Sequence, residues 1–482
     1  MGDSATALGE RLRRRIGAVP ALLRASAAAA ELEACGIRLD ISRQRIDAAA
    51  LAELRAFADA IDVAGTELAM ARGAIVNRTE RRSALHTALR TRDAEAPADV
   101  LEAVRGERER ALRFADDVRA GAWCGASGRK ITAVVNIGIG GSDSGPRLVC
   151  DALAQLADGP AVHFLSNVDG HAAARLLPRL DPEATLAIVS SKSLGTRETL
   201  LNAATTREWF AGAGIRGAAL ARHIVTVSAR KDAARVIEVP EAEQFMLWDW
   251  IGGRFSVWGS TGLPVMLAIG PRHFGDLLNG AATMDRHAEA APLDRNLPAT
   301  LAALAFWNSA VLQMPSHCLL PYDERLRGMV TWLQQLEMES LGKSRTLAGE
   351  LTSLPTAQVV WGGVGTDAQH TFFQALRQGT LHTAVDIVLI ERPNHDYAEH
   401  HRALLANARA QAEALVTADP DSCALNAVSV VQLDELTPSA LGGLLALYEH
   451  KTTMLATLLG INAFDQPGVE LGKKLARDLE GQ

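Results

Sequence analysis

Residues 131–145 read ITAVVNIGIGGSDSG, a short β-branched apolar run that passes directly into a glycine-rich loop. A helix-like stretch follows over residues 146–156. A parallel strand that is covered on both faces has this continuous apolar pattern, and in doubly wound proteins such a strand feeds a helix. The stretch therefore predicts the first strand, loop and helix of a doubly wound α/β domain.

The same unit recurs along the chain. Further short strands, separated by helical stretches, are predicted at residues 161–166, 184–189, 223–227, 317–320, 358–361 and 385–390, with helical segments after the last of them. Residues 1–120 are instead rich in Ala, Leu, Arg and Glu, which favour helices, and lack a clear strand alternation. We therefore predict an α/β protein with parallel-rich sheets, divided into a helical N-terminal segment over residues 1–120 and two α/β domains over residues 121–285 and 286–482.

Composition excludes several classes of function. The 482 residues carry a formal charge of -7 with no long block of one sign, so a nucleic-acid binder or a polybasic membrane protein is not expected. No run of 18 uncharged apolar residues is present, and no membrane span is predicted. The five cysteines are scattered and lack C-x-x-C spacing, which favours neither a zinc site nor a disulfide framework and indicates a cytoplasmic setting.

The glycine loop at residues 138–145 is a candidate anion site, because glycines let backbone amides approach an anion at a helix start. It fails the dinucleotide fingerprint, since Asp143 stands where the third glycine is required, and it lacks the Gly-Lys-Ser/Thr end of a Walker loop. A phosphate on something smaller than a dinucleotide fits better. A tight turn that binds no ligand is the alternative.

A second candidate loop, VSSKSLGT at residues 189–196, lies between a predicted strand and a predicted helix. Any one hydroxyl there would be explained by helix capping, but the loop carries three serines or threonines besides Ser190, together with a lysine. Lysine is scarce in this chain, with seven lysines against forty-two arginines. A compact ammonium and several hydroxyls at a helix N-terminus are suited to a phosphate dianion.

Five further residues are candidates for acid–base or electrostatic roles. Arg254 lies in an apolar, glycine-containing stretch, where it is either a buried, paired arginine or a cation placed where negative charge develops on a substrate. Glu337 and Glu339 are two residues apart and would not share a helix face, so only one is expected to point inward. His370 could titrate near neutral pH or be structural, and Lys473 alone is an ordinary residue of a helix start.

Together these segments resemble the glucose-6-phosphate isomerase (phosphoglucose isomerase) family in motif order and residue type from about Val76 to Lys474. The resembling stretches are NRTE at 77–80 with Leu85-His86, the glycine loop, SNVDG at 166–170, the lysine loop, WDWIGGRFS at 248–256, LPYD at 320–323, QQLEMESLGK at 334–343, Gly365-Thr366 with Gln369-His370, and FDQPGVELGK at 464–473. The resemblance implies two sugar-isomerase (SIS) domains with a helical N-terminal portion, and a homodimer whose active sites lie between subunits.

The resemblance also implies a role for each matching residue. Glu339 matches the base that moves a proton between C1 and C2 through a cis-enediol(ate), and Arg254 matches the residue that stabilises this intermediate. His370, from the neighbouring subunit, and Lys473 match the groups that assist ring opening, and Glu198 would orient the histidine. The substrate-binding residues would be Gly141, Ser142, Ser191, Lys192, Ser193 and Thr196 at the phosphate, with Gln335 and Gln466 at the sugar hydroxyls.

The implied reaction is the reversible isomerisation of glucose 6-phosphate and fructose 6-phosphate, which requires no redox cofactor or metal. The expected partners are the hexose phosphate and a second copy of the chain. Two alternatives remain: an isomerase of broader phosphosugar preference, and a non-catalytic sugar-phosphate-binding regulator. The chain departs from the usual family pattern at Leu194, Gly195, Leu336, Glu337, Gly363, Val364 and Pro467.

Overall fold

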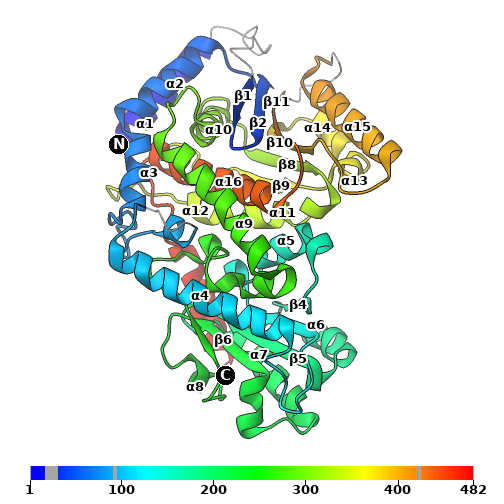
Figure 1. Ribbon diagram of the computed structural model, residues 1–482. Helices are drawn as coiled ribbons and strands as arrows, with labels where there is room; N and C mark the ends of the chain where they lie inside the picture. Colours follow the sequence, from blue (N-terminus) through cyan, green and yellow to red (C-terminus); the bar gives the residue numbers. More distant parts are fainter. Residues whose placement is uncertain (1, 17–30, 91–94, 420, 422–424, 481–482) are drawn as a thin grey trace.

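The computed structural model describes residues 2–16, 31–90, 95–419, 421 and 425–480 (Figure 1). Within these residues the strands are β1 (Glu31–Ala34), β2 (Ile37–Arg43), β3 (Ala133–Ile137), β4 (Ala161–Leu165), β5 (Thr185–Ser190), β6 (Ile224–Ser228), β7 (Gln244–Met246), β8 (Ser316–Tyr322), β9 (Val359–Gly362), β10 (His382–Ile390) and β11 (Leu425–Leu433). They form two sheets that lie at opposite ends of the molecule in Figure 1. The α/β class expected from the sequence is confirmed.

Helices surround and join the two sheets. The α-helices of the described residues are α1 (Gly2–Ile16), α2 (Ala48–Ala60), α3 (Val63–Ala71), α4 (Ala98–Ala120), α5 (Ser144–Ala152), α6 (Gly170–Leu176), α7 (Arg197–Gly212), α8 (Ala233–Val236), α9 (Leu263–Ala290), α10 (Leu297–Phe306), α11 (Met329–Leu333), α12 (Glu339–Leu341), α13 (Gly365–Gln369), α14 (Phe373–Gln378), α15 (Ala398–Val416), α16 (Pro438–Leu459) and α17 (Glu470–Glu480). Two five-residue turns are π-helical, η10 (Trp307–Val311) and η12 (Gln334–Met338). No helix in this described part of the chain is long and apolar enough to cross a membrane.

The first sheet is entirely parallel, with strand order β4-β3-β5-β6-β7. Its central strands are buried on both faces. Val134 and Ile188 belong to the main core, whereas their neighbours Val135 and Val189 face the separate apolar cluster beneath α6 and α7. This two-sided burial explains why the apolar run before the glycine loop does not alternate with polar residues.

The second sheet has the order β1-β2-β11-β10-β8-β9, in which β8 to β11 are parallel and the β1–β2 hairpin runs antiparallel. The segment before residue 120 is mainly helical, as expected, but it also contains β1 and β2, which were not predicted. Ile37, Leu39 and Ile41 alternate with polar residues and are buried against the sheet. This period-two signal is confined to one short strand within a helix-favouring composition.

Two other strands were not expected. β11 lies in the segment after residue 390, for which only helices were predicted, and β7 is a three-residue edge strand. β11 contains three valines and runs through the middle of its sheet between β2 and β10, where its polar residues Asn426 and Ser429 are buried as well. The domain boundaries at residues 120 and 285 remain predictions.

Helices α9 and α16 cross between the two sheets and pack closely against each other. A Cβ atom at Gly442 would lie 2.0 Å from the carbonyl oxygen of Leu277, so only glycine allows this approach. α16 thereby runs through the centre of the molecule, where nearly all of its residues are buried. It brings polar side chains to the region beneath the candidate active site.

Candidate active site

The glycine loop lies at the carboxyl end of β3 and meets two other segments. A Cβ at Gly138 would lie 2.9 Å from the Ser190 carbonyl oxygen, and one at Gly141 would lie 2.0 Å from the carbonyl oxygen of Gly253. Gly141 is therefore required by the close approach of another backbone segment, irrespective of any ligand. The loop is the junction at which the end of β5 and the segment around Gly253 come together. Ser142, within the loop, is half-buried.

The lysine loop follows β5 and precedes α7. Lys192 donates hydrogen bonds from Nζ to the carbonyl oxygens of Asp249 (2.8 Å) and Ile251 (2.9 Å). Burial lowers the pKa of Lys192, and the nearby Arg82 lowers it further. The lysine thus anchors its loop to the backbone that leads into Arg254.

The hydroxyls of this loop serve local structure to different degrees. Ser191 Oγ accepts a hydrogen bond from the Leu194 amide, and Ser193 Oγ accepts one from the Gly195 amide. Leu194 has a φ of 49°, the left-handed region that a leucine rarely adopts. Thr196 is the N-cap of α7 but makes no side-chain cap hydrogen bond. Ser193 is exposed and Thr196 is half-buried, so both can reach a ligand.

Arg254 is the most contacted cation of the site. It is 5% exposed and donates to Ser340 Oγ (2.7 Å), to Gln466 Oε1 (2.8 Å) and to the carbonyl oxygen of Ala463. Its Nη1 lies 3.3 Å from Glu339 Oε1. Burial lowers its pKa, an effect that Glu339 and Asp465 oppose. Arg254 is therefore a buried, paired arginine, and the carboxylate beside it is the candidate base; its role at a substrate stays a prediction.

Glu339 follows the π-helical turn η12, at the start of α12. Its side chain is 24% exposed, and its Oε2 accepts a hydrogen bond from Gln335 Nε2 (3.1 Å). Gln335 Oε1 in turn accepts one from the hydroxyl of Ser144 in the glycine loop (2.8 Å). The candidate base is thereby linked to both the arginine and the glycine loop, and it keeps partial access to solvent.

Glu337 points to the opposite side of this turn. It is 5% exposed and contacts Lys451 and His317 in the interior. The expectation that only one of the two carboxylates points inward requires a correction: both have buried partners, but on different faces, and Glu337 is the more buried. The two-residue spacing explains the opposite faces.

A cavity of about 600 Å³ opens beside Glu339, and Lys343 and Gln466 also line it. Lys343 Nζ donates to the carbonyl oxygens of Glu339 and Ser340, and it lies 3.4 Å from Asp465 Oδ1. Burial lowers the pKa of Lys343 to about 8, helped by Arg254. Lys343 was not among the residues expected to form the site. Asp465 was not expected in the site either; in the sequence, only its position next to Gln466 pointed to it.

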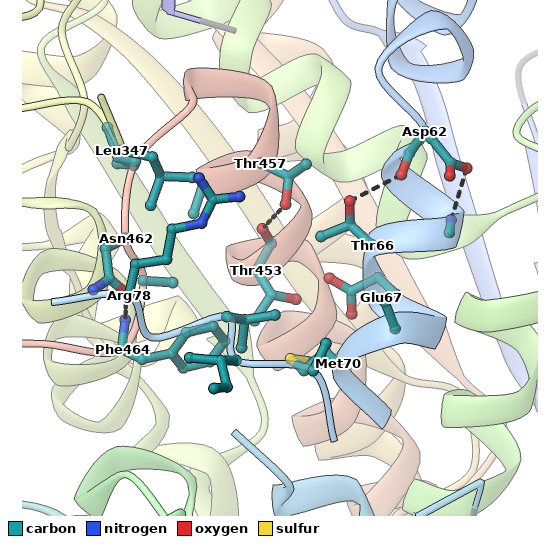
Figure 2. A pocket seen from close by; sticks show the side chains of 18 residues that line it. Asp62, Thr66, Glu67, Met70, Arg78, Leu347, Thr453, Thr457, Asn462 and Phe464 are labelled. Carbon is teal, nitrogen blue, oxygen red and sulfur yellow. Dashed lines mark hydrogen bonds between the residues drawn. The ribbon is translucent and has the colours of Figure 1, made fainter. Parts of the chain in front are cut away.

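A second cavity, of about 320 Å³, lies between α3 and the C-terminal end of α16 (Figure 2). It shares Arg78, Leu347 and Asn462 with the first cavity. None of the residues expected to form the site lines it. The cavity beside Glu339 is therefore the candidate active-site cavity.

Three expected residues lie outside the cluster around Glu339. His370 is exposed at the end of α13, and Glu198 is half-buried in the first turn of α7. Lys473 is on the exposed face of α17, where its Nζ pairs with Glu470 (2.8 Å). Within the described residues of this single chain, no hydrogen bond or ion pair joins any of the three to Glu339 or Arg254.

In the described part of the chain, no three His, Cys, Asp or Glu side chains gather in a way that could hold a metal ion. The cluster combines a carboxylate, a buried guanidinium and amide side chains. Such a set can remove a proton from carbon and stabilise the resulting oxyanion.

Comparisons with known proteins show the family to which the chain is similar. The family model described as phosphoglucose isomerase matches residues 40–427 and 426–482. A glucose-6-phosphate isomerase from Burkholderia pseudomallei (strain 668) is 45% identical over 468 residues, which cover 93% of this chain and 86% of that protein. The corresponding protein from Cupriavidus metallidurans is 46% identical over 475 residues, which cover 94% of this chain and 88% of that protein.

Among solved structures, a glucose-6-phosphate isomerase from Chlamydia trachomatis superposes with a TM-score of 0.89. It is 31% identical, and the match covers 98% of this chain and 95% of that chain. The similarity therefore extends over both sheets and the helices between them.

Proposed function

Because the chain belongs to the phosphoglucose isomerase family, we propose that the cluster around Glu339 is where its chemistry takes place. The protein is an aldose–ketose isomerase, and it interconverts glucose 6-phosphate and fructose 6-phosphate. The observation that supports the location is the contact of Glu339 with both Arg254 and Gln335 at the edge of a cavity.

In the proposed reaction, the Glu339 carboxylate removes the proton at C2 of the open-chain aldose. The bonding pair becomes the C1–C2 double bond of a cis-enediolate, and the charge that develops on oxygen faces the Arg254 guanidinium. The hydroxyl proton of O2 passes to O1, and Glu339 then returns its proton to C1 as the C2–O2 carbonyl forms, which yields the ketose. A hydrogen α to a carbonyl is weakly acidic, so a positioned carboxylate and a fixed cation both lower this barrier.

The phosphate is proposed to bind at the lysine loop, with Ser191, Lys192, Ser193 and Thr196 at the N-terminus of α7 and Ser142 opposite. The positive end of the helix dipole and the exposed hydroxyl of Ser193 support this assignment. Gln335 and Gln466 would contact sugar hydroxyls, because both amides already flank the Glu339–Arg254 pair.

We further propose a homodimer with shared sites. His370 is exposed, and within the described residues of its own chain it makes no hydrogen bond or ion pair with Glu339. This arrangement is expected if His370 serves the partner's site, where Glu198 would orient it. Lys473 would act in ring opening once α17 is docked. A cytoplasmic location is proposed from the cysteines, of which Cys35, Cys124, Cys150 and Cys318 are free.

Solvent isotope incorporation tests the reaction and the proton path together. The protein is incubated with fructose 6-phosphate in deuterated water, and deuterium at C2 of the aldose product is followed. Label at C2 is expected, because a carboxylate exchanges its proton with solvent between removal and return. Turnover without any label at C2 would contradict an enediolate path through Glu339, and binding without turnover would favour the regulator alternative.

A further inference from the structure

Four consecutive residues of α16, Tyr448, Glu449, His450 and Lys451, are almost completely buried. Long charged residues are rarely buried unless they have partners. Glu449 contacts Arg90 and Trp258, and His450 contacts Glu67 and Asp285, all on one side of the helix. Tyr448 and Lys451 belong to a different group of buried side chains, which extends to the turn that precedes Glu339.

We call this second group the Glu337 cluster; it consists of Glu337, Lys451, His317, Asp386 and Tyr448. Lys451 Nζ donates to Glu337 Oε1 (2.7 Å), and His317 Nδ1 lies 3.2 Å from Glu337 Oε2. His317 Nε2 lies 3.0 Å from Asp386 Oδ2, which also accepts the Tyr448 hydroxyl (3.1 Å). Two carboxylates therefore face one lysine and one histidine, and the charges balance when the histidine is protonated.

The electrostatics of the cluster favour this ionised state. Burial alone would raise the pKa of Glu337, but Lys451 and His317 lower it to about 2. Burial and Lys451 would lower the pKa of His317, but Asp386 and Glu337 raise it above its usual value. Breaking such a pair from one side leaves an uncompensated buried charge, whereas removing both partners is often tolerated.

Glu337 connects the cluster to the site. It lies in the π-helical turn Gln334–Met338, between Gln335 and the candidate base Glu339. Gln335 and Glu339 are four residues apart and meet through a hydrogen bond, so they share the face that looks onto Arg254 and the cavity. Glu337, two residues from each, leaves the turn on the opposite side and reaches α16 and β8. The turn is therefore held from both faces.

We propose that Glu337 and Lys451 are positioning residues for the isomerase reaction: their ion pair sets the rotation of the π-helical turn and so holds the Glu339 carboxylate against Arg254. The inference rests on the proposed role of Glu339 as the base. A directional ion pair selects one rotation of the turn, whereas an apolar contact of similar size would accept several. Displacement of a reacting group by about 1 Å costs on the order of 10²-fold in rate.

Single substitutions cannot test this alone, because each leaves an unpaired buried charge. Lys451→Met leaves Glu337 and Asp386 facing only His317, and we expect it to lower the melting temperature strongly. The double variant Glu337→Gln with Lys451→Met leaves the balanced pair of His317 and Asp386. We expect it to regain most of the lost thermal stability.

The decisive measurement is the steady-state kinetics of the double variant, well below its melting temperature. If the pair positions Glu339, kcat falls by roughly 10- to 100-fold while KM stays within about 3-fold, because the base is displaced and the phosphate site is not. The conservative single variant Glu337→Asp keeps the negative charge opposite Lys451 and should retain most of the wild-type kcat. A double variant with kcat within about 2-fold of the wild type would overturn the proposal, as would a loss that appears only in KM.

Glu67→Gln is the matched control. Glu67 is 1% exposed and contacts His450, the neighbour of Lys451 on α16, but it does not touch the turn. We expect it to lower the melting temperature without changing kcat. Glu339→Gln is measured in parallel: if it keeps wild-type kcat, the proposed base is wrong, whereas an inactive Glu339→Gln beside a fully active double variant contradicts the positioning inference alone.

Discussion

Arg254 Nη1 lies 3.3 Å from Glu339 Oε1, although the two residues are 85 positions apart in the chain. Arg254 follows the last strand of the first sheet, and Glu339 follows a π-helical turn beside the second. The arginine is nearly fully buried, whereas the carboxylate is partly open to the cavity. A buried, fixed cation beside an accessible carboxylate is suited to form and stabilise an enediolate without rearrangement of the protein.

Replacement of the candidate base tests the centre of the proposal. Glu339→Gln should lower kcat by at least about 10²-fold, because general base catalysis is lost, while KM changes little since the phosphate contacts remain. A coupled assay in both directions measures this. Glu350→Gln, at an exposed carboxylate outside the cavity, is the control and should retain full activity. Wild-type kcat in Glu339→Gln would refute the assignment.

Arg254→Lys keeps the charge but loses the planar fork that reaches Ser340, Ala463 and Gln466. We expect kcat to fall by about 10²- to 10³-fold, the usual loss when a donor to a developing oxyanion is removed. The melting temperature should also fall, since buried carbonyl oxygens lose the donor that Arg254 provides. Arg327→Lys, on the surface, serves as the control. A change confined to KM would show that Arg254 only binds substrate.

Gly141→Ala tests the junction between the glycine loop and the Arg254 segment. The added Cβ would lie 2.0 Å from the Gly253 carbonyl oxygen and 2.8 Å from the Arg254 amide nitrogen. Such overpacking costs roughly 1–3 kcal/mol or more and should displace Arg254, so both stability and kcat fall. Gly106→Ala, in the exposed part of α4 with no atom within 4 Å, should instead stabilise by about 0.5–1 kcal/mol. Chemical denaturation distinguishes the two.

Stability should depend on pH through His450. Burial alone would lower its pKa, but hydrogen bonds to Asp285 and Glu67 raise it to about 9. A raised histidine pKa contributes stability that is fully present below the unfolded value of about 6.5 and is lost as the pH rises through 9, by up to about 3 kcal/mol. Burial also raises the pKa of Glu289, to about 7. The stability that Glu289 contributes is therefore likewise lost as the pH rises, but already between about 4.5 and 7.

Urea unfolding at about pH 6 and about pH 9.5 checks this dependence. The free energy of unfolding should be larger at the lower pH, and His450→Gln should reduce the difference between the two conditions. An equal difference in the variant and the wild type would assign the pH dependence to other groups.

Mixed dimers test whether His370 serves the partner's site. His370→Ala and Glu339→Gln are each expected to be nearly inactive alone. Co-refolded in equal amounts, they should regain about a quarter of wild-type activity, because half of the dimers are mixed and each mixed dimer carries one intact site. Two His370 variants mixed together provide the control. No recovery in dimers shown to exchange subunits would place His370 in the site of its own chain.

Local sequence was sufficient to find most of the strands that are buried on both faces and the loops that follow them. The continuous run before the glycine loop and the scarce Lys192 identified two of the segments that meet near Arg254. The β1–β2 hairpin was missed, because its alternation occupies a few residues inside an otherwise helix-favouring stretch. β11 was missed because Asn426, Ser429 and Gln432 interrupt its apolar residues, so it has no continuous apolar run. The hydrogen bonds of Lys343 to the backbone of Glu339 and Ser340 could not be inferred from residue spacing.

The sequence by itself determined the α/β class, the order of the motifs and the types of side chain available for proton transfer, because these depend on periodicity and composition within short windows. Only the tertiary structure decided that Glu339 meets Arg254 while Glu337 turns away to Lys451. It also decided that Gly141 is required by a neighbouring backbone. Such contacts join residues far apart in the chain, and they arise from the packing of α9, α16 and the two sheets, which no local pattern specifies.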